Sequence, residues 1–136
     1  MIRKVSIILL FTMMICFSSL YFSGCGAFER VDVSSANSGK TNFFYNDRKV
    51  VKTLSEDDLG KIKELFDGKH LYSDEPSCGF TENVSITMDE ETFYIACDSC
   101  PIIYWKNKDK YFKLSDSEYT ELTQILDSYG FVFPCV

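Results

Sequence analysis

Four cysteines outside the N-terminal segment are the residues of this 136-residue chain with the clearest capacity for chemistry. An even number of cysteines in a small exported domain favours disulfides, and four cysteines allow three pairings. We expect Cys97 to pair with Cys100, because the Cys97-Asp98-Ser99-Cys100 turn brings its ends together. Cys78 and Cys135 each follow a predicted helix in a Pro-containing segment, so we expect these two to form the second disulfide.

The same cysteines could support two other chemistries. Cys97-x-x-Cys100 has the spacing of a thiol–disulfide redox pair, but strand-like residues 102–105 follow it instead of the helix whose N-terminus would stabilise a thiolate. Cys78, Cys97, Cys100 and Cys135 could together bind one zinc ion, although only one of the two usual C-x-x-C pairs is present. A redox or zinc-binding function is therefore the alternative to structural disulfides. The preferred interpretation requires no cofactor.

Other catalytic arrangements find little support in the sequence. His70 is the single histidine, which excludes a multi-histidine metal site, and it lies in a predicted polar loop. The acidic clusters at 56–58 and 89–91 are explained by helix capping and by turn formation. The sequence contains no Gly-rich phosphate loop, calcium-binding loop or metalloprotease helix motif. We therefore expect a protein that is not an enzyme.

The N-terminus indicates where the protein acts. A basic start (MIRK) precedes an apolar run over residues 5–22, which ends in Ser23-Gly24-Cys25. Such an arrangement is typical of an export signal. It resembles the lipobox signal of bacterial lipoproteins, which implies cleavage after Gly24 and palmitate-type acyl chains on Cys25. Lipidation would anchor the protein at the outer face of the cell membrane, and an uncleaved membrane anchor is the alternative.

The net charge of the chain limits the classes of molecule that it is expected to bind. Removal of residues 1–24 takes two of the 14 basic residues and none of the 20 acidic ones, so the formal charge changes from −6 to −8. An acidic surface disfavours nucleic acid and anionic lipid as partners, and membrane contact must come from the lipid anchor. Residues 25–40 hold the lipidated cysteine and a small, polar segment that predicts a flexible tether. The folded domain is expected over 41–136.

A repeated pattern predicts the two helices. Residues 54–67 align without a gap with residues 114–127, and apolar positions recur at helical spacing in both segments. Ser55 and Ser115 are N-cap candidates, each with an acidic residue three positions later, as in a capping box. Glycines past the ends, Gly68 and Gly130, suit left-handed C-caps.

Three hairpins are predicted around the helices, over 43–51, 84–97 and 102–113, and a short edge strand over 131–133. The expected fold is α+β: an antiparallel sheet of about five to seven strands with two helices on one face. The first and last hairpins, each followed by a helix, form two ββα units that suggest a duplication.

Four aromatic residues of the outer hairpins are candidates for an interaction surface. Phe44, Tyr45, Tyr104 and Trp105 fall at equivalent positions of the two units. Exposed aromatic patches mark contact sites, whereas the same residues could instead pack in the core. A register shift of one residue exchanges the two faces of a strand, so the sequence leaves both alternatives open.

The mature part resembles small, uncharacterised cysteine-containing lipoproteins of Gram-positive bacteria. The resemblance rests on Cys78-Gly79-Phe80, on the 96–101 segment and on Phe133-Pro134-Cys135, and it covers residues 41–136. It implies no particular activity. Together with the lipobox, it leads us to expect a membrane-tethered, extracytoplasmic module that binds a protein or another envelope component.

Overall fold

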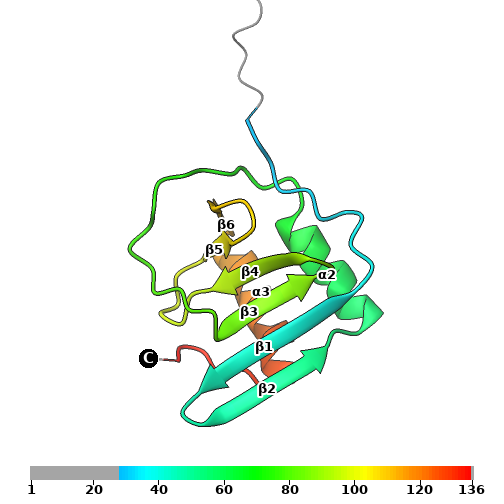
Figure 1. Cartoon of the computed structure of the whole chain (residues 1–136), viewed down its shortest axis with the longest axis vertical. Helices are drawn as coiled ribbons and strands as arrows, with labels where there is room; N and C mark the ends of the chain where they lie inside the picture. Colours follow the sequence, from blue (N-terminus) through cyan, green and yellow to red (C-terminus); the bar gives the residue numbers. More distant parts are fainter. Residues whose placement is uncertain (1–27, 136) are drawn as a thin grey trace, which may run out of the picture.

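The computed structural model describes residues 28–135 as a six-stranded antiparallel sheet with two helices on one face (Figure 1). The predicted export signal and the predicted lipidation site, Cys25, lie outside the described residues. Across the sheet the strand order is β2-β1-β3-β4-β5-β6. The predicted α+β class is confirmed. The strands are β1 (Gly39–Tyr45), β2 (Arg48–Thr53), β3 (Val84–Met88), β4 (Glu91–Ile95), β5 (Ile102–Trp105) and β6 (Lys110–Lys113), and the helices are α2 (Glu56–Phe66) and α3 (Asp116–Ser128).

The two predicted ββα units occupy opposite halves of the sheet. β2 and β1 form one edge and lead into α2, β5 and β6 form the other edge and lead into α3, and the β3–β4 hairpin lies between them. In the first turn, Asn46 and Asp47 have φ values of 48° and 62°. Two-residue hairpin turns require this left-handed region, which Asn and Asp tolerate. All three predicted hairpins are confirmed.

Both helices begin and end at the predicted residues. The Ser55 side chain accepts a hydrogen bond from the backbone of Asp58, and Ser115 forms a reciprocal capping box with Glu118. Gly68 and Gly130 follow the helices at φ 72° and 100°, where a side chain would be strained. One face of each helix is buried against the sheet: Leu59, Ile62, Leu65 and Phe66 from α2, and Leu122, Ile125 and Leu126 from α3.

A tyrosine at the end of α3 completes the cap of α2. The Ser55 backbone N–H donates to the Tyr129 hydroxyl at 2.9 Å, and this hydroxyl donates to the Asp58 carboxylate at 2.7 Å. The hydrogen bond from Tyr129, followed by that from Ser55, lowers the pKa of Asp58 below its ordinary value. The start of one helix is thereby connected to the end of the other.

Tyr129→Phe is expected to lower the free energy of unfolding by about 1 to 2 kcal/mol, because it removes a hydroxyl that makes one neutral and one charge-assisted hydrogen bond. Urea unfolding of the full chain measures the change. Tyr45→Phe is the matched control, since the Tyr45 hydroxyl has no hydrogen bond within residues 28–135, and we expect a change of a few tenths of a kcal/mol at most. Equal effects of the two variants would contradict the proposed coupling of the helices.

The tether predicted over residues 25–40 is wrong for its described part. Val31, Val33 and Ala36 are buried in the core. The backbone also pairs with the segment after α2: Val31 N–H donates to the Lys69 carbonyl, and Leu71 N–H donates to the Glu29 carbonyl. The partners of this segment lie more than 30 residues away along the chain, so a local sequence pattern could not reveal them. The folded domain therefore begins by residue 29.

The C-terminal segment also differs from the prediction, because residues 131–133 form no strand. Phe131 instead is buried on the helix side of the sheet, with its ring centroid 4.9 Å from that of Phe43. Phe133 stacks on Phe131 at 5.9 Å. Aromatic packing on the core, rather than strand pairing, holds the end of the chain.

Candidate binding site

The face of the sheet opposite the helices carries a row of three tyrosines. In the pairing register, Tyr94 of β4 lies opposite Tyr104 of β5, and Tyr104 lies opposite Tyr111 of β6. Their ring centroids are 5.6 Å and 4.9 Å apart, the second pair being stacked. The row follows from strand alternation, because the neighbouring residues Phe93, Ile103 and Phe112 point to the helices and are fully buried.

The segment between α2 and β3 forms a second wall beside this row. It passes around the β5–β6 end of the sheet, as Figure 1 shows in green. Tyr72 forms an isolated bridge with Tyr111, and their backbones exchange two hydrogen bonds of 2.9 Å. Further along the same segment, Phe80 packs against two of the tyrosines: its ring centroid lies 5.9 Å from the ring centroids of both Tyr104 and Tyr111.

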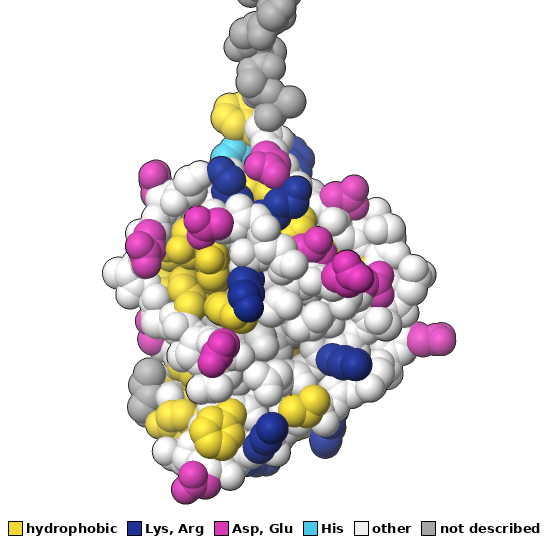
Figure 2. All heavy atoms as spheres, in the orientation of Figure 1, with side chains coloured by type: hydrophobic (Ala, Val, Ile, Leu, Met, Phe, Trp, Pro, Cys, Tyr) yellow, Lys and Arg dark blue, Asp and Glu magenta, His cyan; other side chains and the backbone are white. Residues whose placement is uncertain are grey.

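These elements enclose an open hollow of about 520 Å³, which we call the aromatic hollow. Figure 2 shows hydrophobic side chains gathered over this part of the sheet, with acidic side chains around them and a basic side chain against their edge. The lining contains three carboxylates and no Lys, Arg, His, Asn or Gln. The lining residues are Glu75, Cys78, Gly79, Phe80, Thr81, Glu82, Tyr94, Tyr104, Asp109 and Tyr111.

The pKa values of two phenols in the hollow, Tyr104 and Tyr111, are raised, so both stay protonated at neutral pH. The Tyr104 hydroxyl donates to Asp109 at 2.9 Å, and this hydrogen bond is the main cause that raises the pKa of Tyr104 to about 12. Burial, and then the negative charge of Glu75, raise the pKa of Tyr111. Within the described residues, the carboxylates of Glu75 and Glu82 have no hydrogen-bond or ion-pair partner. The hollow is therefore rich in acceptors and poor in donors.

The raised pKa of Tyr104 predicts a loss of stability at alkaline pH. A pKa of about 12 in the fold lies above the ordinary value of 10, so the stabilisation is complete below pH 10 and is lost between pH 10 and 12. Absorbance titration of phenolate in the full chain is expected to show fewer late-titrating groups in Tyr104→Phe than in the unmodified protein. A late transition that Tyr104→Phe does not alter would contradict the assignment.

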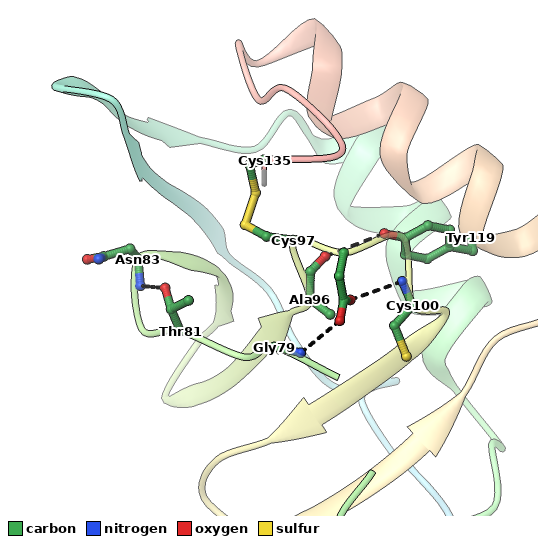
Figure 3. The surroundings of a disulfide bond; sticks show 9 residues. Gly79, Thr81, Asn83, Ala96, Cys97, Cys100, Tyr119 and Cys135 are labelled. Carbon is green, nitrogen blue, oxygen red and sulfur yellow. Dashed lines mark hydrogen bonds between the residues drawn. A yellow bond between two sulfur atoms is a disulfide. The ribbon is translucent and has the colours of Figure 1, made fainter. Parts of the chain in front are cut away.

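All four candidate cysteines form disulfides, but the pairing predicted from the sequence is wrong. Cys78 is bonded to Cys100. Cys97 is bonded to Cys135 (Figure 3). Cys97 precedes the turn and points into the core beside the C-terminal segment, where Cys135 N–H also donates to the Cys97 carbonyl at 2.9 Å. The two cysteines of this turn thus form disulfides with two different residues, Cys97 with Cys135 and Cys100 with Cys78. The spacing of the turn could not reveal this, since both partners are distant in the sequence.

The Cys78–Cys100 disulfide holds the second wall of the hollow in place. Beside it, the Asp98 carboxylate accepts hydrogen bonds from the backbone N–H groups of Gly79 at 3.0 Å and of Cys100 at 3.3 Å. The Cys97 backbone N–H adds a bond to the Gly79 carbonyl. Phe80 follows Gly79 directly, so these contacts position its ring. Residues 28–135 contain no cluster of three or more His, Cys, Asp or Glu that could hold a metal ion.

The four aromatic candidates from the sequence do not form one patch. Trp105 is buried on the helix side at 4% exposure, where its indole N–H donates to Glu91, so its prediction as an interaction residue is wrong. Phe44 is 43% exposed on the open face, two strands away from the hollow, and Tyr45 is half-buried against the core. Only Tyr104 belongs to the aromatic hollow.

Sequence reasoning missed Phe80, Tyr94 and Tyr111 as members of the hollow. A signal was available for two of them, because Tyr94 and Tyr111 alternate with buried residues in predicted strands. Phe80 lies in a segment without periodicity, and only the disulfide and the bonds to Gly79 bring it to the tyrosines. His70 is an exposed loop residue, as predicted, and packs against Phe28 rather than the hollow.

Comparison with known proteins adds no family to these observations. The part of the chain that the structure describes has no helix long and apolar enough to cross a bilayer. No protein-family model, no curated protein and no solved structure matches this chain.

Proposed function

We propose that this chain is a membrane-tethered, extracytoplasmic lipoprotein that acts by binding a protein or another envelope component, and that the aromatic hollow is its binding site. The single observation that carries the proposal is the hollow itself, which Tyr94, Tyr104, Tyr111 and Phe80 line. It lies on the sheet face that the helices leave uncovered (Figure 1). Rigid aromatic side chains supply contact area at a low cost in conformational entropy, which is why they dominate binding sites.

The chemistry of the lining favours binding over catalysis. General acid–base catalysis needs a group whose pKa lies near the working pH, and the phenols of Tyr104 and Tyr111 are shifted away from neutrality. The sole histidine lies outside the lining, and the one cysteine in it, Cys78, is held in a disulfide. Disulfides at all four cysteines also disfavour the zinc-binding alternative.

The lipobox supports attachment close to the membrane. Since the Glu29 carbonyl already accepts a bond from Leu71, three residues, 26–28, lie between Cys25 and the folded domain. The four Cα–Cα steps from Cys25 to Glu29 span at most about 14 Å when fully extended. A lipid on Cys25 would therefore hold the domain against the membrane surface. The hollow would lie near that surface too. Arg30, close to the anchor, bridges to His70, and two residues later Tyr72 bridges to Tyr111 of the hollow.

Mass spectrometry of the protein extracted from a bacterial membrane tests the anchoring. The expected species is residues 25–136 with a diacylglyceryl group and an acyl chain on Cys25, and cells fed labelled palmitate should incorporate the label. Cys25→Ala should abolish labelling, whereas Cys16→Ala, in the part of the chain that is removed, should not. An unlipidated chain that retains residues 1–24 would contradict the proposal and support an uncleaved anchor.

A further inference from the structure

We infer that the aromatic hollow receives a cationic side chain, arginine above all, carried by an extended basic segment of a partner protein. This inference rests on the proposed function, since it names the chemistry that the same hollow would recognise.

Charge is the first reason. The hollow is lined by Glu75, Glu82 and Asp109 and by no basic residue. The segment that forms its second wall, residues 71–83, contains Asp74, Glu75 and Glu82 and no Lys or Arg. An electronegative concave surface attracts a cation and repels anionic groups, including acidic lipid headgroups.

The rings are the second reason. The face of a tyrosine carries a negative potential that attracts ammonium and guanidinium groups. The protein already uses this attraction at the rim of the hollow, where the Lys106 ammonium lies 5.8 Å from the centre of the Tyr94 ring. Tyr104 and Phe80, both partly exposed, offer further ring surface, and Tyr111, buried at 8% exposure, stacks against Tyr104 and supports it from below. A guanidinium is planar, so it can stack on such a surface while its N–H groups reach carboxylates.

The donor inventory separates a cation from a neutral sugar. Aromatic platforms also bind sugars, whose hydroxyls need both donors and acceptors. The lining lacks Asn, Gln, Arg and His, and its side-chain donors are the tyrosines and Thr81. The Tyr104 hydroxyl already donates to Asp109. An acceptor-rich, donor-poor site suits a ligand that only donates, and a guanidinium has five N–H donors and no acceptor.

The size of the hollow indicates a polypeptide rather than a small free cation. At about 520 Å³ it falls in the range that accommodates a drug-sized ligand, well above a single guanidinium group. A long basic side chain with its flanking main chain matches this volume better. The hollow is open along the sheet surface, so an extended segment can enter without rearrangement of the walls.

Peptide titration tests the inference on the full chain in detergent. The probes are a fluorescent nine-residue Gly/Ser peptide with two arginines, the same peptide with citrulline at both positions, and an N-acetylglucosamine oligomer. We expect the arginine peptide to bind at least about 10-fold more tightly than the citrulline peptide, and Tyr104→Ala to weaken it about 10-fold, as the loss of a desolvated cation–π contact implies. The double variant Glu75→Gln with Glu82→Gln should weaken binding and flatten its salt dependence.

Phe44→Ala, a change to an exposed ring on the same sheet face, is the matched control and should leave the affinity unchanged. Equal affinity for the arginine and citrulline peptides would overturn the inference. Tyr104-dependent binding of the sugar oligomer, without binding of the arginine peptide, would also overturn it but would leave the hollow as the binding site. Binding of the arginine peptide that is insensitive to Tyr104→Ala would overturn both the inference and the proposed function.

Discussion

Replacement of Cys97 and Cys135 by alanine is expected to lower the free energy of unfolding by about 4 kcal/mol, the chain-entropy value for a loop of this length. The two residues are 38 positions apart, and their disulfide joins the end of β4 to the C-terminal residue of the described chain. Both cysteines are buried, at 9% and 4% exposure, so the variant also loses packing around them. Urea unfolding of the full chain, monitored by Trp105 fluorescence, measures the change.

The double variant Cys78→Ala with Cys100→Ala is the matched control for this prediction. Its disulfide closes a shorter span of 22 residues, for which the same relation gives about 3.4 kcal/mol, and it is half-buried, so we expect a somewhat smaller loss than for the buried pair. It should, however, disturb the hollow more, because it releases the wall that carries Phe80. A smaller loss for the buried pair than for the Cys78–Cys100 pair would contradict the assigned roles of the two disulfides.

Phe66→Ala is the single substitution expected to destabilise the protein most, by about 3 to 5 kcal/mol. Phe66 is the last residue of α2 and is fully buried. Its ring lies edge-on to those of Phe93 and Phe112, at 5.3 Å and 5.0 Å, so truncation opens a cavity where the helix meets β4 and β6. Urea unfolding measures the loss.

Phe44→Ala makes the same chemical change at a position that is 43% exposed, and we expect it to cost less than about 1 kcal/mol. The difference between the two variants isolates the contribution of burial. Similar values for Phe66→Ala and Phe44→Ala would contradict the placement of Phe66 at the centre of the core.

Local rules allowed much of the fold to be predicted from the sequence. The N-cap serines, the C-cap glycines and the turn residues Asn46 and Asp47 each act within a few residues, so their patterns identify the helices and hairpins directly. The packing of both helices on one sheet face follows from their apolar stripes. The register of the strands then determines which aromatic residues face the helices.

Contacts between distant segments could not be predicted in this way. The pairing of Cys97 with Cys135 depends on where the C-terminal segment lies in space. The burial of Val31 and Val33 depends on pairing with the residues that follow α2, and their polar neighbours Asp32 and Ser34 mask this burial in the sequence. The Tyr129 bridge likewise joins two helix ends that lie 71 positions apart in sequence.

In the candidate site, too, the features set by local pattern could be predicted and those set by contacts between distant segments could not. Strand alternation is sufficient to place Tyr104 on the open face, and it applies equally to Tyr94 and Tyr111. The hollow exists only because a disulfide, the Asp98 carboxylate and the Tyr72 bridge fold an aperiodic segment against this row. That segment supplies Phe80 and two of the three carboxylates, and with them the proposed preference for cations.

Backbone amide shift mapping of the full chain, titrated with the two-arginine peptide, tests most directly whether the aromatic hollow is the binding site. We predict that the largest shift changes occur at Phe80, Tyr94, Tyr104, Asp109 and Tyr111, and that the citrulline peptide produces much smaller ones. The largest changes at Phe44 and Val51 of the β1–β2 edge, or changes spread evenly over the chain, would contradict the assignment of the hollow as the binding site.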